Sequence, residues 1–230
     1  MADGDRGRGG GHGAGGSWMR RRLAARGGPM IWALSVWWLG EGLGGLLSGT
    51  ASPVTGAPGA VILYALIAAA VWPRSWAPQA GSVTAASPLG QRWSLVVWLV
   101  LWGGLAYLIV QQTVRAPRAL HDAIAANAAG EPGWLAAVDR GAAAAIGSHG
   151  LAVCSVLAVV FALIAAGIFH PATVRPTLLL AVAFGLICWV AGENFGQILT
   201  GRATDPSTGP LLVLLAACYW PWRPPSSRRC

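Results

Sequence analysis

Two glutamates stand at the ends of long apolar runs. Glu193 follows LLLAVAFGLICWVA and a glycine, and Glu41 follows WALSVWWLG. Pointing an ionisable side chain at lipid costs at least roughly 2.5 kcal/mol on insertion scales, so such residues usually face protein or water. A carboxylate placed there can bind a proton, a cation or the amine of a polar solute. Groups that could add hydrogen bonds to such a ligand stand nearby in the sequence, at Ser48, Thr200, Asn194 and Gln197.

The two glutamates belong to two copies of one motif. Residues 37–52 and 189–204 match at a constant offset of 152, with the shared pattern W-x-x-G-E-x-x-G-x-[LI]-L-[ST]-G-x-A-[ST]. Both copies continue with P-x-T-G and then with a proline that opens the next apolar run, Pro58 or Pro210. Chance is a poor explanation for so many matching glycine, hydroxyl and acidic positions. The sequence therefore predicts an internal repeat in which the two glutamates are equivalent.

If each motif is helical, its small and polar residues share one face. Positions i, i+3, i+4 and i+7 are occupied by Glu41, Gly44, Gly45 and Ser48 in the first copy and by Glu193, Gly196, Gln197 and Thr200 in the second. The glycines would let another backbone approach closely, so each glutamate is expected to face protein. No arginine lies within these runs. Each acid is therefore expected to be protonated, bound to a cation or exposed to water, unless it caps backbone groups of a neighbouring loop.

The elements that carry the motifs are predicted to be transmembrane helices. The chain is 55% hydrophobic and only 10% charged, whereas soluble domains carry about 25% charged residues. Six apolar segments can be read, each bounded by Gly, Pro or Arg, at roughly 29–48, 58–72, 93–112, 148–169, 177–199 and 210–222. The predicted fold is all-α, a six-span transmembrane bundle over 29–222, with cytoplasmic tails at 1–28, rich in Gly and Arg and disordered, and at 223–230.

The arginines predict the orientation of this bundle. All sixteen basic residues are arginine; with both termini cytoplasmic, twelve lie inside and four outside, as the positive-inside rule requires. The expected location is the inner, or plasma, membrane. The repeat joins spans one and two to spans five and six, and both copies then run from inside to outside. This geometry predicts a parallel pseudo-two-fold axis along the membrane normal.

Two features of the outer side bear on a binding site. The loop 113–147 is predicted to hold two short amphipathic helices that lie on the membrane or cap the bundle, with Asp139 and Arg140 as a solvated pair. The apolar residues at helical spacing in this loop are Leu120, Ala123, Ile124, Trp134, Leu135 and Val138. The spans after each motif are short, and the loops GTASPVTGA and GRATDPSTG are expected to dip below the outer surface.

Several functional classes lack support. The arginines flank spans, so nucleic-acid binding is not expected. Gly40, Gly42 and Gly45 spell G-x-G-x-x-G, but no strand precedes them, so the dinucleotide reading fails. His149 and His170 stand at opposite ends of one span and cannot share a haem. Since catalytic and metal motifs are also missing, we expect no enzyme, no metal and no cofactor.

The pattern as a whole resembles uncharacterised bacterial six-span membrane proteins, a resemblance that covers most of the chain and implies no known activity. Two hypotheses remain. The first is a small transporter or channel-like protein in which Glu41 and Glu193 bind a proton, a cation or a small polar solute. The second is a non-catalytic structural subunit or assembly factor of a membrane complex. The expected partners are the lipid bilayer and either another membrane protein or a second copy of this chain.

Overall fold

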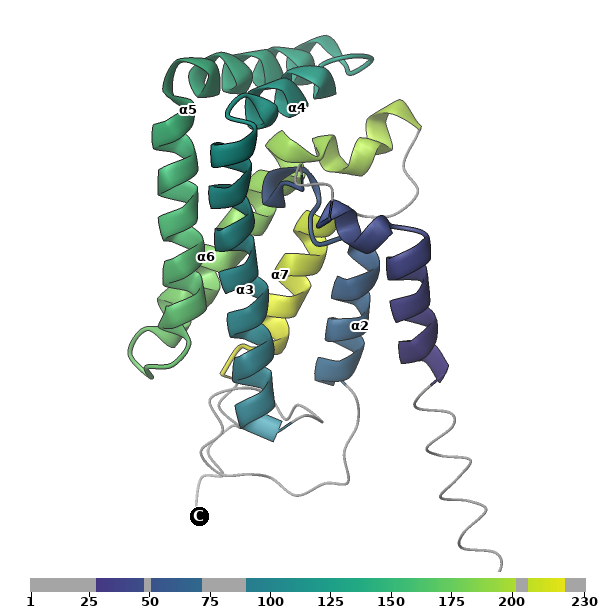
Figure 1. Cartoon of the computed structure of the whole chain (residues 1–230), viewed down its shortest axis with the longest axis vertical. Helices are drawn as coiled ribbons and strands as arrows, with labels where there is room; N and C mark the ends of the chain where they lie inside the picture. The colour runs from purple at the N-terminus through teal and green to yellow at the C-terminus, as the bar shows by residue number, and fades with distance from the viewer. Residues whose placement is uncertain (1–27, 48–50, 72–89, 202–206, 222–230) are drawn as a thin grey trace, which may run out of the picture.

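The computed structural model describes residues 28–47, 51–71, 90–201 and 207–221. Within these residues the chain is helical and contains no strand (Figure 1). Three of the described helices are long and apolar enough to cross a membrane, and three shorter apolar helices accompany them. The long ones are Arg92–Arg115, Gly133–Gly167 and Val174–Thr200, and the short ones are Gly28–Leu39, Ala60–Val71 and Thr208–Cys218. The predicted all-α fold is thus confirmed for the described residues, and the three long apolar helices support the predicted membrane location.

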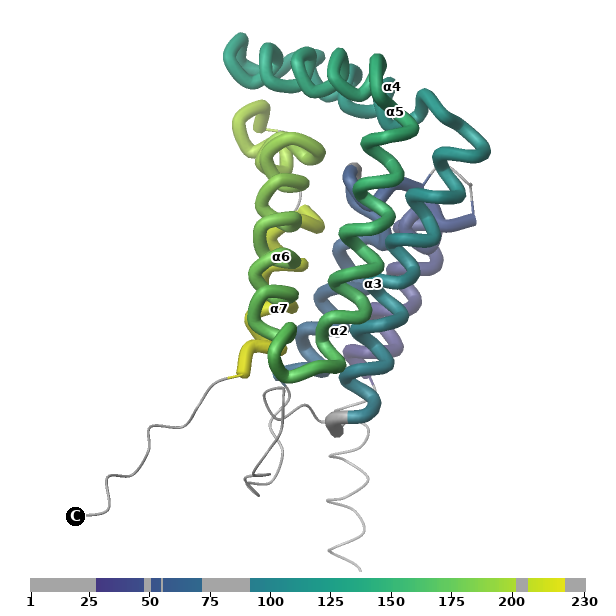
Figure 2. Tube along the Cα trace, turned by 90° about the vertical axis from the view of Figure 1, so that its left-hand side faces the viewer, coloured from purple at the N-terminus to yellow at the C-terminus, as the bar shows by residue number. Residues whose placement is uncertain are grey.

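The body of the bundle is built around the long helices α3 (Gly90–Arg115) and α5 (Gly133–Gly167), which run side by side (Figures 1 and 2). The indole Nε1 of Trp98 donates a hydrogen bond to the carbonyl oxygen of Ile164 at 2.8 Å, which ties the two helices together. Aromatic rings fill the space between these helices and the C-terminal part of the chain. This cluster consists of Trp98, Trp102, Phe161, Phe184 and Tyr219.

Large apolar side chains also cover the outside of the long helices. Leu151, Val159 and Leu163 of α5 are 72%, 57% and 57% exposed. A soluble protein rarely leaves so extended an apolar surface in water, whereas lipid tails are as apolar as leucine. The outward faces of these helices are therefore suited to contact with a bilayer.

A cap lies across one end of the bundle (Figure 2). It consists of α4 (Ala119–Asn127) and the first part of α5, which bends at His149, where φ is −134°. The predicted pair of helices in this region is present, but the second one is not separate: it continues through the bend into the fourth apolar segment. Leu120, Ile124 and Leu135 are buried as expected, while Trp134 remains 59% exposed.

The buried face of the cap corrects one prediction. Asp139 is fully buried, so Asp139 and Arg140 are not a solvated pair. The reason is helical spacing: Asp139 falls on the same face of α5 as the buried Leu135, Ala136 and Ala143. Arg140, the next residue, points away from that face and is exposed.

The C-terminal part of the chain forms a broken helix followed by a short one. Helix α6 (Val174–Ile187) continues as a π-helical turn, η3 (Cys188–Gly192), and then as η4 (Asn194–Thr200). Helix α7 (Thr208–Cys218) returns beside α6 and also packs against α2 (Ala60–Val71) (Figure 1).

Helices α2 and α7 contain only 12 and 11 residues. At 1.5 Å per residue they span about 17–18 Å, against roughly 30 Å for the hydrocarbon core of a bilayer. The predicted short helices after the two motifs are therefore confirmed. A helix of this length that reaches one membrane surface must have its other end inside the bundle.

Candidate functional site

The two motif copies share an unusual backbone turn. Residues 42–45 have φ values of 55°, 59°, 63° and 72°, and residues 194–197 have 45°, 56°, 68° and 58°. These positions correspond one to one at the offset of 152 residues. The prediction that each motif forms a right-handed helix with one polar face is therefore wrong, because the chain turns in the left-handed sense directly after each glutamate.

Glycine accounts for part of this conformation. Three of the four residues in the first turn are glycine, which enters the left-handed region at no steric cost, and Asn194 opens the second turn with a side chain that tolerates it. Leu43, Phe195 and Gln197 each cost roughly 1–2 kcal/mol in that region. Strain of this kind persists only where the surrounding structure holds it in place.

The glycines also allow the close backbone approach that the sequence predicts, although the partner is a loop. A Cβ atom on Gly44 would collide with the carbonyl oxygen of Pro58, and one on Gly192 would collide with the carbonyl oxygen of Val54. Both motif copies therefore press against residues 54–58, the segment that leads into α2.

Glu193 holds the beginning of α7. Its Oε1 accepts a hydrogen bond from the backbone N–H of Thr208 at 3.0 Å, and its Oε2 accepts one from the N–H of Gly209 at 2.8 Å. The first N–H groups of a helix have no partner within the helix, and the helix dipole favours negative charge at this end. The carboxylate supplies both the acceptors and the charge.

Glu41 does the same for α2. Its Oε1 accepts a hydrogen bond from the backbone N–H of Val61, in the first turn of that helix, at 3.2 Å. The adjoining Gly59 lies so close that a Cβ atom there would collide with Glu41 Oε2. The indole Nε1 of Trp37, one turn before the glutamate, donates to the carbonyl oxygen of Pro58 at 2.7 Å. Each half-buried acid thus caps the short helix that follows it.

The segments that follow the two motifs also touch each other. The hydroxyl of Thr208 donates a hydrogen bond to the carbonyl oxygen of Gly56 at 2.9 Å. A Cβ atom on Gly56 would lie 3.8 Å from Glu193 Oε1. Glu193 and Glu41 therefore border the same stretch of chain, between Gly56 and Val61.

A second polar centre joins the cap to the second motif. The side-chain Nδ2 of Asn194 donates to Asp139 Oδ2 at 3.0 Å and to the carbonyl oxygen of Asn127, also at 3.0 Å. Asn127 in turn donates from Nδ2 to the carbonyl oxygen of Gly192 at 2.7 Å. Asp139 and Asn194 are 0% and 2% exposed. This centre contains the only fully buried carboxylate among the described residues.

The remaining predicted site residues stand apart from these centres. Gln197 is exposed, and the hydroxyl of Thr200 donates locally to the Gln197 carbonyl oxygen at 2.9 Å. Ser48 lies outside the described residues. Asp139 and Asn127 were not predicted as site residues. The helical spacing of Asp139 with the buried Leu135 was the one sequence feature that could have indicated its burial.

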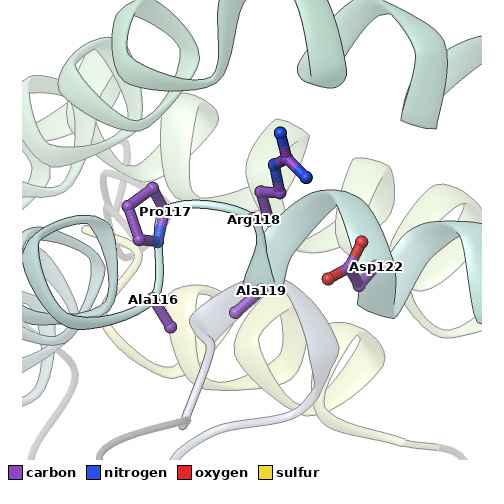
Figure 3. Close-up of a pocket in the computed structure, with 5 residues that line it drawn as sticks. All are labelled: Ala116, Pro117, Arg118, Ala119 and Asp122. Carbon is purple, nitrogen blue, oxygen red and sulfur yellow. The ribbon is translucent and has the colours of Figure 1, made fainter.

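A pocket of about 420 Å³ opens on the surface where α3 meets α4 (Figure 3). It is lined by Ala116, Pro117, Arg118, Ala119 and Asp122. None of the predicted site residues lines this pocket. Over the part of the chain that is described, no three His, Cys, Asp or Glu side chains are grouped in a way that could hold a metal ion.

Comparisons with protein families, with curated proteins and with solved structures found no match to this chain.

Proposed function

We propose that this protein is a small transporter or channel-like membrane protein for a proton, a cation or a small polar solute. The observation that supports this function best is the pair of left-handed turns at corresponding motif positions, each followed by a short helix. Broken helices that begin inside the bilayer, at corresponding places in two halves of a chain, are a recurrent feature of substrate sites in transporters. Irregular backbone at that depth is tolerated only where protein or water covers it.

The proposed architecture is an internal repeat with six crossings. The N-terminal helix Gly28–Leu39 with α2 forms one unit, and α6 with α7 forms the other. The matching φ values and the matching helix caps support a common origin for the two units, and the packing of α2 against α7 supports the same division of the chain. We propose that both termini are cytoplasmic, in the inner membrane, with the cap on the outer side.

Within this proposal the glutamates hold the site together. Two backbone N–H groups donate hydrogen bonds to the Glu193 carboxylate, and the dipole of α7 favours negative charge at that position. A transported ion would have to compete with those hydrogen bonds. Glu41 and Glu193 therefore keep the ends of α2 and α7 inside the bundle, where a cation that passes would meet their charge.

The caps also favour a second candidate function, a non-catalytic structural subunit or assembly factor. The hydrogen bonds to Val61, Thr208 and Gly209 give both glutamates a role that requires no ligand. In that case the exposed apolar faces of the outer helices would bind another membrane protein or a second copy of this chain.

Flux through proteoliposomes separates the two functions. The purified protein is reconstituted, and uptake of protons, radiolabelled sodium and radiolabelled rubidium is measured against protein-free vesicles under an imposed membrane potential. The transport function predicts uptake of at least one probe, reduced at least tenfold in Glu41→Gln and Glu193→Gln, while Gln197→Ala behaves as wild type. Absence of uptake for all three ions, together with a partner that co-purifies and is lost in the same variants, would establish the second function instead.

A further inference from the structure

The buried pair formed by Asp139 and Asn194 has hydrogen-bonding capacity that the described part of the chain does not use. Asp139 Oδ2 accepts from Asn194 Nδ2, but Asp139 Oδ1 and Asn194 Oδ1 are both buried and have no hydrogen-bond partner. A buried oxygen without a donor costs roughly 1–3 kcal/mol, and more when it belongs to a charged group. Two such oxygens, on side chains that are hydrogen-bonded to each other, indicate that a group other than these side chains supplies their missing partner.

The orientation of the amide is fixed by its neighbours. Asn194 Nδ2 faces two acceptors, the carbonyl oxygen of Asn127 and the carboxylate of Asp139. Exchanging the nitrogen and oxygen would turn Oδ1 toward both of these acceptors and lose two hydrogen bonds. Asn194 Oδ1 is therefore directed elsewhere, as an acceptor.

Among the described residues no cation pairs with Asp139. The hydrogen-bond donor that these residues supply to it is a neutral amide, and Arg140, the neighbouring cation on α5, is exposed. From α4, His121 and Asp122 pair with each other at 2.8 Å. From the motif side, Glu193 turns its carboxylate to the start of α7. A fully buried carboxylate with an unpartnered oxygen favours a positive charge beside it.

We propose that Asp139 and Asn194 form a binding site for one small positively charged ion, a proton or an alkali-metal cation. The shared chemistry is a single positive charge that oxygen lone pairs accept. One carboxylate and one amide oxygen match a hard, monovalent ion, whereas copper would favour sulfur or imidazole ligands. As the ion site of a transporter this pair rests on the proposed function, but its occupancy is an equilibrium property that is measured without flux.

The proposal makes the cap part of the site. Asn127 ends α4, Asp139 lies on α5, and Asn194 opens the left-handed turn of the second motif, where its φ is 45°. A positive charge at this point attracts Asp139 and Asn194 toward a common centre. Its binding would therefore couple the position of the cap to the break that precedes α7.

The test uses the purified full-length protein in detergent and two measurements. Infrared spectra at neutral pH report whether a protonated carboxyl group is present, through a carbonyl stretch that shifts in D₂O. Thermal unfolding is followed in NaCl, KCl and choline chloride at equal ionic strength. The variants are Asp139→Asn, which places an N–H donor where the ion would sit, and Asp122→Asn, which removes an exposed acid from the cap as a control. Asn194→Gly keeps the left-handed turn and removes the second oxygen.

If the ion is a proton, wild type shows the carboxyl band, Asp139→Asn loses it, Asn194→Gly shifts it, and Asp122→Asn retains it. If the ion is an alkali cation, the unfolding temperature rises with NaCl or KCl but not with choline chloride, and Asp139→Asn abolishes that rise. Wild type with neither the band nor a cation-specific rise would overturn the proposal, whether or not the variants fold. Either positive result without flux in proteoliposomes would establish the site while refuting the proposed transport.

Discussion

The hydroxyl of Thr208 donates a hydrogen bond to the carbonyl oxygen of Gly56, at a distance of 2.9 Å and across 152 residues of sequence. That separation equals the offset between the two motif copies, and both residues belong to the P-x-T-G segments that follow them. Matching segments of two related units meet where a two-fold axis passes between them. In the two P-x-T-G segments Thr208 corresponds to Thr55 and Gly56 to Gly209. A contact between these segments is compatible with the proposed pseudo-symmetry.

This contact gives the first prediction. Thr208 is 4% exposed. Valine has nearly the same shape as threonine, so Thr208→Val preserves the packing but removes the hydrogen-bond donor to the Gly56 carbonyl oxygen. We expect a loss of about 1–3 kcal/mol in the free energy of unfolding, measured by denaturant titration in detergent micelles. Thr208→Ser keeps the hydroxyl and should lose clearly less. A loss in Thr208→Ser with little or none in Thr208→Val would mean that the methyl group, and not the hydrogen bond, matters here.

The helix caps give the second prediction. Glu193→Ala removes the acceptors of the N–H groups of Thr208 and Gly209, so we expect a loss of about 1–2 kcal/mol in the free energy of unfolding. Glu41→Ala should cost a similar amount through Val61. Hydrogen exchange should show increased opening at the starts of α7 and α2, respectively. Opening spread evenly over all helices would contradict the assignment of these acids to two particular helix ends.

The matching glutamine variants separate stability from transport. Glutamine keeps one oxygen that can accept a hydrogen bond, so Glu193→Gln should lose less stability than Glu193→Ala. A stable Glu193→Gln variant that loses ion flux would show that function needs the negative charge of Glu193 and that folding does not.

Much of the architecture follows from composition and spacing. The apolar runs predicted apolar helices, and the described residues contain three that are long enough to cross a membrane and three shorter ones. The length of an uninterrupted apolar segment is the sequence feature that indicates such helices. The cap helices were predicted from the spacing of residues such as Leu120 and Ile124, which are buried. The burial of Asp139 escaped prediction because a lone acid beside an arginine usually indicates a solvated surface.

The handedness of the motif could not be predicted in the same way. Glu41, Gly44 and Gly45 fit the spacing of a right-handed helix, and small residues at that spacing are typical of contacts between membrane helices. The same glycines also permit a left-handed turn, and the apolar pattern does not distinguish the two. In the structure Gly44 lies against the carbonyl oxygen of Pro58. This tertiary contact accompanies the left-handed turn, and the apolar pattern of the sequence does not predict it.

The left-handed turns give the third prediction. Gln197 is exposed and has a φ of 58°, a conformation in which glycine is free of steric cost, and the equivalent residue of the first copy is already Gly45. Gln197→Gly relieves roughly 1–2 kcal/mol of backbone strain in the folded protein. It also lowers the free energy of the unfolded chain by about 0.4–1 kcal/mol, because glycine gives that chain more conformational entropy. We therefore expect a net stabilisation of about 0.5–1 kcal/mol, measured by denaturant titration in micelles.

Two comparisons make this prediction specific to the backbone. Gln197→Ala removes the same side chain but keeps a Cβ atom, so it should bring no stabilisation. Gly45→Gln, the reverse change in the first copy, places a Cβ atom at a φ of 72° and should destabilise the protein. Opposite signs for the two equivalent positions are expected only if both copies turn in the left-handed sense. A destabilising Gln197→Gly would show instead that residues 194–197 are helical in the ordinary right-handed sense.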